Sequence, residues 1–292
     1  MNRVLIVGCG DIGRRVARLW REEGVPVCAL ARSSQSARRL EVLGITPVAG
    51  DLDEPESLAG LPTKGALAYY LAPPPGRGET DPRMRAFLEC IPPGEEPETI
   101  VYMSTTAVYG DLRGGWATEE TPPLPSAARG MRRLDAENAL LAWGRQGSVP
   151  VVILRVAGIY GPGRLPIEKV REGAPVLAGN DSPFSNRIHS EDLARVCVAA
   201  ARRGTGGAVY NVSDGQPGTI AQYYCAVADL LGVPRPPTMT MAEARRVMSQ
   251  AMLSYLSESK RVDNRKMREE LGVTLLHPTL ETGLAASLDG EE

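Results

Sequence analysis

The beginning of the chain carries its most specific pattern, Val4-Leu5-Ile6-Val7-Gly8-Cys9-Gly10-Asp11-Ile12-Gly13. Four apolar residues predict a buried strand, three glycines follow at the G-x-G-x-x-G spacing, and residues 14–23 have the apolar stripe of a helix. Strand, glycine turn and helix together form the dinucleotide-binding fingerprint. The alternative is a tight turn between a strand and a helix that holds no ligand.

Each glycine of this turn has a predicted physical role. Gly8 permits a tight turn, Gly10 lets the backbone approach a pyrophosphate, and Gly13 lets the helix pack against the strand. The N-terminus of the following helix offers unpaired N–H groups to the phosphates. We therefore predict that the whole turn binds the cofactor. Its residues are Gly8, Cys9, Gly10, Asp11, Ile12 and Gly13.

Length and charge restrict the class of protein. The 292 residues are 43% hydrophobic, enough for one large α/β domain or two closely joined ones. A formal net charge of -2 gives no reason to expect nucleic acid or an anionic membrane as a partner. No apolar run approaches the ~18 residues of a membrane span, and the first strand begins too early for a signal peptide. These features predict a soluble, cytoplasmic protein.

Cysteine and histidine usage argues against a metal site. The five cysteines are an odd number without a C-x-x-C pair, so neither a disulfide framework nor a zinc site is expected. Two histidines, His189 and His277, are too few for a histidine-based metal site or catalytic triad. Cys9, inside the glycine turn, is either an oxidation-sensitive thiol or a small residue tolerated there.

The first half of the chain alternates strand and helix patterns, which predicts βαβ units and a Rossmann-type, doubly wound parallel sheet of the α/β class. Predicted strands cover residues 4–7, 25–30, 45–49, 66–71, 99–104, 149–156 and 208–212. Predicted helices cover residues 14–23, 34–43, 82–90, 126–143, 190–201, 219–231 and 241–255. We predict a cofactor-binding domain at residues 1–160, to which residues 187–215 return. Residues 161–186 and 216–292 are assigned to a smaller, interleaved α/β part on the substrate side.

Ligands of open parallel sheets bind beyond the carboxyl ends of the strands, which adds candidate cofactor residues there. They are Asp51 and Leu52 after the third strand and Ala72 and Pro73 after the fourth. The end of the second strand reads Ala31-Arg32-Ser33-Ser34 and lacks the carboxylate that usually binds the ribose of NAD. Arg32 offers a charged fork for a 2′-phosphate, and Ser33 adds a hydroxyl, so the sequence favours NADP(H) over NAD(H). Alternatively, Arg32 is a solvated loop residue and Ser34 caps a helix.

Several later segments, in the expected order, resemble the NAD-dependent epimerase/dehydratase family of extended short-chain dehydrogenases/reductases. They are Met103-Ser104-Thr105-Thr106-Ala107-Val108-Tyr109-Gly110, Gly158-Ile159-Tyr160-Gly161-Pro162-Gly163, Asn186-Arg187-Ile188-His189-Ser190-Glu191-Asp192-Leu193-Ala194, Tyr210-Asn211-Val212-Ser213 and residues 259–272. The resemblance covers nearly the whole chain. One departure is Val7, where the glycine turn of extended members begins with glycine.

A second departure concerns the family's catalytic Y-x-x-x-K motif. Counting back from Glu137 and forward from Tyr109 places the tyrosine position at Arg129 and the lysine position at Arg133. The pattern is similar to an atypical subgroup that keeps the fold and lacks the tyrosine. A guanidinium cannot replace the tyrosine as acid and base, because it keeps its proton at working pH.

The two arginines are four residues apart and so share one helix face. That face suits an anionic substrate or a developing oxyanion, or else it is an exposed, solvated arginine face. Arg133 also retains the ability to donate hydrogen bonds to the hydroxyls of the cofactor ribose.

The resemblance assigns further residues to the site. Thr105 matches the family's substrate-positioning Ser/Thr and also belongs to the cofactor set, together with Arg133 and Tyr160. Tyr109 and Tyr160 are candidates to replace the missing acid, although packing is the role we favour for both. Arg187 lies two residues from the position at which members of the family have a phosphate-binding arginine.

Two functions remain open. The first is an NADP-linked oxidoreductase or epimerase-like enzyme acting on a small polar or nucleotide-sugar-like substrate. The second is a dinucleotide-binding redox sensor or regulatory module with little or no turnover. Because many relatives dimerise through a four-helix contact, the resemblance also implies a homodimer through the helix at residues 126–143.

Overall fold

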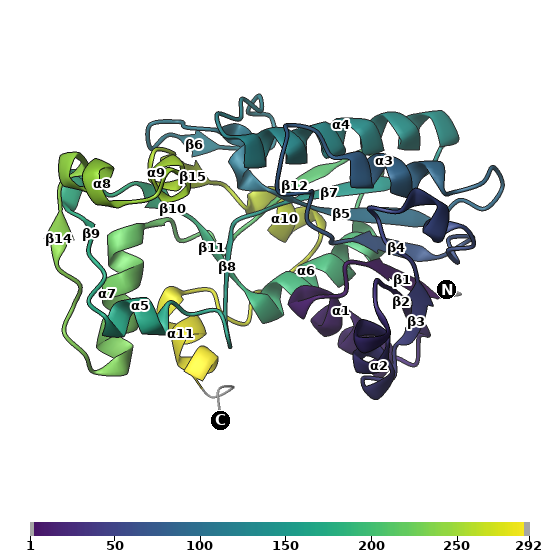
Figure 1. Cartoon of the computed structure of the whole chain (residues 1–292), viewed down its shortest axis with the longest axis horizontal. Helices are drawn as coiled ribbons and strands as arrows, with labels where there is room; N and C mark the ends of the chain where they lie inside the picture. Colours follow the sequence, from purple (N-terminus) through teal and green to yellow (C-terminus); the bar gives the residue numbers. More distant parts are fainter. Residues whose placement is uncertain (1–2, 289–292) are drawn as a thin grey trace.

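The computed structural model describes residues 3–288 and is built around a seven-stranded parallel sheet (Figure 1). The strand order is β12-β7-β5-β4-β1-β2-β3. Its strands are β1 (Val4–Val7), β2 (Val27–Ala31), β3 (Thr46–Ala49), β4 (Leu67–Tyr70), β5 (Thr99–Thr105), β7 (Val151–Val156) and β12 (Val209–Val212). The central strands β1, β4 and β7 are buried along their whole length, as expected for a parallel sheet covered on both faces.

Helices cover both faces of this sheet, which confirms the predicted doubly wound architecture (Figure 1). One face carries α1 (Asp11–Glu22), α2 (Ser34–Val42) and α6 (Ser190–Arg203). The other carries α3 (Pro82–Glu89) and the long α4 (Ala128–Gly147). Each layer encloses its own apolar core, one around Trp20 of α1 and one around Phe87 of α3.

The strand order reverses between β1 and β4, and this point brings the glycine turn to the ligand edge of the sheet. Val7 at the end of β1 lies opposite Tyr70 at the end of β4. The segments that follow the two strands, Gly8 onward and Leu71 onward, therefore emerge side by side. A crevice at such a reversal is where open α/β sheets bind their ligands.

A second group of helices and strands, in the left half of Figure 1, lies beside the sheet, and its strands form short two-stranded sheets. Its larger elements are α5 (Ile167–Arg171), α7 (Ile220–Leu231), α8 (Met241–Val247), α9 (Gln250–Leu256) and α11 (Leu280–Leu288). The strand pairs are β8 (Gly158–Tyr160) with β11 (Arg187–His189), β10 (Phe184–Ser185) with β13 (Gly218–Thr219), β9 (Val176–Leu177) with β14 (Thr238–Met239), and β6 (Trp116–Ala117) with β15 (Arg261–Val262). The helix α10 (Arg265–Glu270) packs against β12 of the main sheet. The predicted domain boundaries stay predictions.

One local prediction is wrong. A single helix was expected at residues 241–255, but the chain is extended at Met248, and α9 starts afresh because Ser249 Oγ accepts a hydrogen bond from Met252 N. At the start of α6 the N-cap is His189, whose Nδ1 accepts a hydrogen bond from Glu191 N. The imidazole can cap here because it lies buried at the end of β11.

A buried ion pair fixes α4 to the sheet. Arg155 of β7 donates two side-chain nitrogens to the Glu137 carboxylate of α4, and the shortest contact, Nη2 to Oε2, is 2.8 Å. Ser104 of β5 donates its hydroxyl to the same carboxylate. Glu137 is 1% exposed and Arg155 is 5% exposed. Because two strands and one helix meet at this carboxylate, the pair sets where α4 lies along the sheet.

Removing one partner is therefore expected to destabilise the fold strongly. Arg155→Met leaves the Glu137 carboxylate buried without its cation, which costs about 3–5 kcal/mol. Denaturant unfolding monitored by circular dichroism measures the loss. Arg235→Ala, which removes a surface arginine paired with Asp229, is the control and should leave the free energy of unfolding nearly unchanged, because solvent screens this exposed pair. Equal losses of unfolding free energy in the two variants would show that the buried pair stabilises the fold no more than the surface pair does.

Candidate dinucleotide and substrate site

The glycine turn has the geometry that a bound pyrophosphate requires. Gly8 has a φ of +94°, and a Cβ there would lie 2.4 Å from Ala72 N, so the backbone after β4 excludes any side chain. A Cβ on Gly13 would lie 3.1 Å from Gly8 O. A Cβ on Gly10, the N-cap of α1, would meet no atom of the described residues within 4 Å. The space in front of Gly10 is open, so the backbone of the turn is accessible to a dinucleotide.

Asp11 is held by two arginines at this turn. Its Oδ1 accepts a hydrogen bond from Arg15 Nε at 2.9 Å, and its Oδ2 accepts one from Arg164 Nε at 2.6 Å. Burial raises the pKa of Asp11, but the hydrogen bond from Arg164 and the charge of Arg15 outweigh it, so the net shift is downward. Arg164 follows the Gly161–Gly163 segment, so this ion pair ties that loop to the cofactor turn.

The remaining residues of the turn pack against the fold. Ile12 is buried in the core beneath α1. Cys9 is half-buried, and burial raises the pKa of its thiol to about 11 against the opposing charge of Arg14. The Cys9 thiol is therefore protonated at neutral pH, which favours the small-residue interpretation over a reactive thiol.

A second hollow, of about 490 Å³, lies at the ends of β2 and β3, where the adenine-side ribose of a dinucleotide is expected. Arg32 projects there with 72% of its side chain exposed, and its Nε lies 3.9 Å from Asp51 Oδ2. Ser33, rather than Ser34, caps α2 by accepting a hydrogen bond from Ser36 N. Leu52 packs against the core beneath α3 and so supports the position of Asp51.

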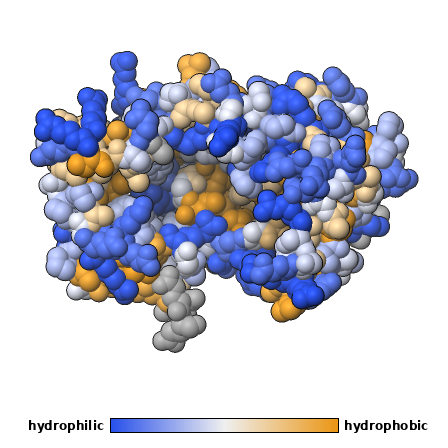
Figure 2. Space-filling view, in the orientation of Figure 1, coloured by the Kyte–Doolittle hydropathy of each residue, from blue (hydrophilic) through white to orange (hydrophobic). Residues whose placement is uncertain are grey.

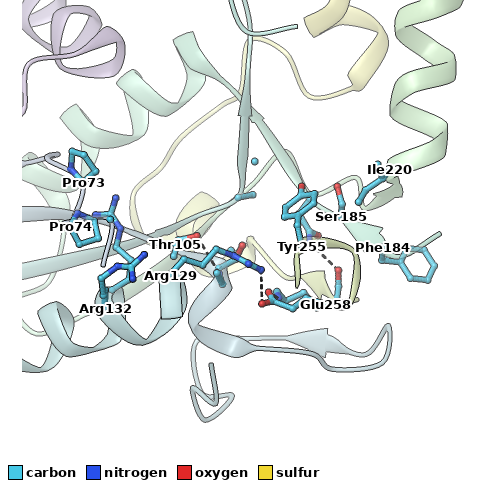
Figure 3. Close-up of a pocket in the computed structure, with 18 of the residues that line it drawn as sticks. Pro73, Pro74, Thr105, Arg129, Arg132, Phe184, Ser185, Ile220, Tyr255 and Glu258 are labelled. Carbon is cyan, nitrogen blue, oxygen red and sulfur yellow. Dashed lines mark hydrogen bonds and ion pairs between the residues drawn. The ribbon is translucent and has the colours of Figure 1, made fainter. Parts of the chain in front are cut away.

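A cavity of about 460 Å³ lies at the carboxyl ends of β4 and β5. Figure 2 shows a hollow between the two halves of the molecule with hydrophobic residues at its floor. We call this space the substrate cavity. It is lined by Pro73, Pro74, Pro75, Gly76, Thr105, Thr106, Ala107, Arg129, Arg132, Arg133, Ala157, Gly158, Phe184, Ser185, Asn186, Ile220, Tyr255, Glu258 and Lys260. In Figure 3, Pro73 and Pro74 stand on one side of it and Phe184, Ser185 and Ile220 on the other.

Four of the predicted residues line this cavity, namely Pro73, Thr105, Arg129 and Arg133. Thr105 ends β5, and its Oγ1 accepts a hydrogen bond from Ala107 N at 3.3 Å, which leaves the hydroxyl proton free to point elsewhere. Arg133 Nη1 donates to Met103 O at 2.9 Å and to Ala72 O at 3.3 Å. Arg133 therefore bridges the ends of β4 and β5 beside the cofactor turn.

Arg129 is neither free nor part of a solvated arginine face. It reaches from α4 toward Glu258, as Figure 3 shows, and its Nη2 donates to Glu258 Oε1 at 2.6 Å. Its Nη1 donates to Ser254 Oγ at 2.9 Å, just beyond the middle of α9. This ion pair holds α9 and the segment after it against α4, on the side of the cavity that belongs to the main sheet.

Two residues of this cluster, Glu258 and Lys260, were missed in the sequence. Lys260 Nζ donates to Glu258 Oε2 at 2.9 Å and also to Gly110 O. Both side chains are buried, and burial lowers the pKa of Lys260 against the opposing effect of Glu258. The only signal in the sequence was that Lys260 belongs to the tail segment that resembles the family, with Glu258 directly before it, and that resemblance assigned neither residue a role. Four cationic side chains and a single carboxylate line the cavity, so it favours an anionic ligand.

The two tyrosines considered as replacement acids pack elsewhere. Tyr109 is buried, donates to Asn211 Oδ1 at 2.7 Å and carries Arg155 over its ring. Tyr160 is buried edge-on against His189, and burial raises its pKa well above the usual value. Neither is among the described residues that line the substrate cavity. Their geometry supports the packing role.

Arg187 also lies apart from the cavity lining. Its guanidinium carbon lies 3.8 Å from the centre of the Tyr223 ring, and this stacking holds β11 against α7. The neighbouring Asn186 does line the cavity. The phosphate-binding role predicted for Arg187 stays a prediction.

Comparisons with known proteins agree with this geometry. The sequence model of the NAD dependent epimerase/dehydratase family matches residues 84–213, and that of the TrkA-N domain matches residues 4–70. A conserved protein of unknown function from Silicibacter pomeroyi has a solved structure that is 32% identical and superposes over both chains in full, with a TM-score of 0.84. This chain belongs to the NAD-dependent epimerase/dehydratase family, with the fold of the extended short-chain dehydrogenases/reductases.

Two further relatives give the family context. A 4-hydroxy-2-methyl-3-oxo-4-farnesyl-3,4-dihydroquinoline-1-oxide ketoreductase from Stigmatella aurantiaca is 27% identical over 80% of this chain and 74% of its own length. The structure of MoeE5 in complex with UDP-glucose and NAD is 24% identical, with a TM-score of 0.77 over 99% of this chain and 98% of that one, and shows the shared fold. The family supports a nicotinamide dinucleotide as the cofactor and an enzymatic function of the oxidoreductase or epimerase type.

Two features of residues 3–288 bear on other classes of protein. Within that range, no helix combines the length and the apolar character needed to cross a membrane. Over the same described residues, no group of three or more His, Cys, Asp or Glu side chains is arranged to hold a metal ion.

The ion pair between Asp11 and Arg164 leads to a prediction about cofactor affinity. Arg164→Ala leaves the Asp11 carboxylate beside the expected pyrophosphate with Arg15 as its only close cation, so NADPH should bind about three- to tenfold more weakly and dissociate faster. Fluorescence titration and stopped-flow displacement measure the two effects. Arg235→Ala is again the control, because its ion pair lies on the surface of α7. An unchanged dissociation rate would refute a role for this loop in retaining the cofactor.

Proposed function

We propose that this chain is an NADP(H)-linked oxidoreductase or epimerase-like enzyme that acts on a small polar or nucleotide-sugar-like substrate carrying negative charge. The observation that carries the proposal is the shared edge of the sheet. The glycine turn, which is open at Gly10, and the substrate cavity, with Thr105 in its wall, meet where β1, β4 and β5 end. A cofactor laid along that edge would present its reactive ring to a substrate in the cavity.

Binding and orientation would be shared among three side chains. Thr105 would donate its hydroxyl proton to a substrate carbonyl or hydroxyl oxygen. Arg133, already bonded to the ends of β4 and β5, would donate its remaining N–H groups to ribose hydroxyls of the cofactor. Arg129 would face the negative charge of the substrate, partly offset by Glu258.

The chemistry at the reacting oxygen would rely on charge. A nicotinamide cofactor, when bound, supplies or accepts the hydride. As negative charge grows on the substrate oxygen, the cationic side chains around the cavity would stabilise it without giving up a proton. Burial makes such stabilisation stronger than it would be in water. Solvent would then provide the proton that the family's tyrosine ordinarily provides.

The preference for NADP(H) rests on Arg32 and Ser33. Arg32 is exposed at the hollow beyond β2, and its charge is only loosely paired with Asp51 at 3.9 Å, so its guanidinium is available for a 2′-phosphate. Ser33 is the N-cap of α2, and the first N–H groups of this helix add to the positive potential at the hollow.

Arg32→Ala is therefore expected to weaken NADPH binding about ten- to a hundredfold, as for a lost charged hydrogen bond, while NADH binding changes less than twofold. Titration of both cofactors with the purified protein measures the ratio. Arg38→Ala, which removes another arginine of α2 outside this hollow, is the matched control. The proposal fails if the wild-type protein binds NADH as tightly as NADPH.

A redox-responsive binding protein with little turnover is the second candidate. The observation in its favour is Arg129, which stands at the predicted tyrosine position and is bound to Glu258. A permanently charged side chain cannot relay a proton there. Such a module would use the same cofactor site to signal through a partner, and α4 remains the surface on which we propose a homodimer contact.

A turnover screen separates the two candidates. We expect NADPH consumption with small carbonyl compounds or keto-sugar nucleotides that carry a negative charge, and Thr105→Val should lower kcat/KM about ten- to a hundredfold with cofactor affinity retained. Thr99→Val, at the other end of β5, is the matched control and should leave kcat/KM unchanged. Tight NADPH binding without turnover across the screen would favour the sensor.

A further inference from the structure

A second cavity, of about 420 Å³, lies among β9, β14, α7, α8 and α9 and has an apolar interior. We call it the methionine pocket. It is lined by Lys169, Glu172, Ala174, Pro175, Val176, Leu177, Ile220, Tyr224, Met239, Val247, Met248, Ser249, Met252 and Leu256. These elements form the far left of the molecule in Figure 1, away from the main sheet. Nothing in the proposed chemistry at Thr105 uses this space.

The methionine pocket adjoins the substrate cavity. Ile220, the first residue of α7, lies in the walls of both. The short helix α9 separates them, because Tyr255 faces the substrate cavity while Met252 and Leu256 face the methionine pocket. A ligand bound near Arg129 therefore has a neighbouring apolar space one side chain away, past Ile220.

The two spaces have opposite character. The substrate cavity carries an excess of cationic side chains. The methionine pocket has one cationic and one anionic side chain, Lys169 on α5 and Glu172 at the end of that helix, and both residues are exposed. Together the two spaces match a molecule with an anionic head and an aliphatic tail. A volume of about 420 Å³ is within the range of about 300–1,000 Å³ found for small-molecule sites.

The pocket wall is also adaptable. Met239, Met248 and Met252 are only partly buried and pack around a small core of Leu177, Ala244 and Leu256. Methionine side chains have three rotatable bonds and fill irregular apolar spaces, which suits a flexible chain better than a rigid ring. Leaving them partly exposed to water is unfavourable, and an aliphatic ligand would cover them.

We propose that the methionine pocket binds the aliphatic tail of an amphipathic anionic substrate whose head lies in the substrate cavity. The inference rests on the proposed function for the position of the head and extends it by naming the class of substrate. Selectivity for chain length is its direct consequence. Each buried methylene contributes about 0.8 kcal/mol, so affinity should rise up to about fourfold for each one that enters the pocket.

The test uses the full chain saturated with NADP+ and straight-chain carboxylates from four to fourteen carbons. Calorimetry should show affinity rising with chain length to a plateau set by the pocket volume. Met252→Glu, which places a carboxylate in the pocket, should weaken dodecanoate binding at least tenfold and butanoate binding less than twofold. Leu276→Glu, which charges an exposed leucine outside the pocket, should change neither.

A second variant tests the same inference in case Met252→Glu does not fold. Met239→Trp fills the pocket without adding charge and should likewise remove the gain from long chains, with NADPH affinity unchanged. Affinity that does not depend on chain length, or an equal loss in Leu276→Glu, overturns the inference. So does dimerisation that is abolished by Met252→Glu, because the apolar face would then be a contact between copies. Turnover of short substrates with no chain-length effect would leave the proposed function intact and reject the pocket alone.

Discussion

The ion pair between Glu137 and Arg155 is the constraint on which the site depends. It joins α4 to β7, and Ser104 adds β5 to the same carboxylate. Arg133 lies about one turn and Arg129 about two turns before Glu137 on the same helix, so their placement at the carboxyl edge of the sheet follows from this buried contact. A buried charge without its partner is costly, which makes this position of α4 strongly preferred over a shifted one.

The substrate cavity is built from both parts of the molecule, and charge pairing joins them. Arg129 comes from a helix of the main sheet, whereas Glu258 and Lys260 come from the segment after α9. The pairing of Arg164 with Asp11 makes a second such connection at the glycine turn. Both contacts combine a residue of the cofactor-binding side with one from the other part, so the charge within the cleft depends on how the two parts are joined.

The parts of the fold that could be predicted are those with strong local patterns. The glycine turn, the buried strands and the alternating helices each have a period or a spacing that short-range sterics impose, and the structure has them close to the expected bounds. The two-residue strands β6, β9, β10, β13, β14 and β15 are too short to show a period. The helix expected at residues 241–255 was divided by Ser249, whose capping hydrogen bond competes with continuation of the helix.

The sequence by itself determined the class of fold, the family and the place of the cofactor turn, because glycine spacing and hydrophobic alternation act over a few neighbouring residues. Tertiary structure alone decided the state of the arginines. Arg129 has a carboxylate partner 129 residues away in the chain and Asp11 has a guanidinium partner 153 residues away, so no local pattern could reveal either pairing. Tertiary structure also placed the methionine pocket beside the substrate cavity, since packing of α7 against α9 brings Ile220 into both walls.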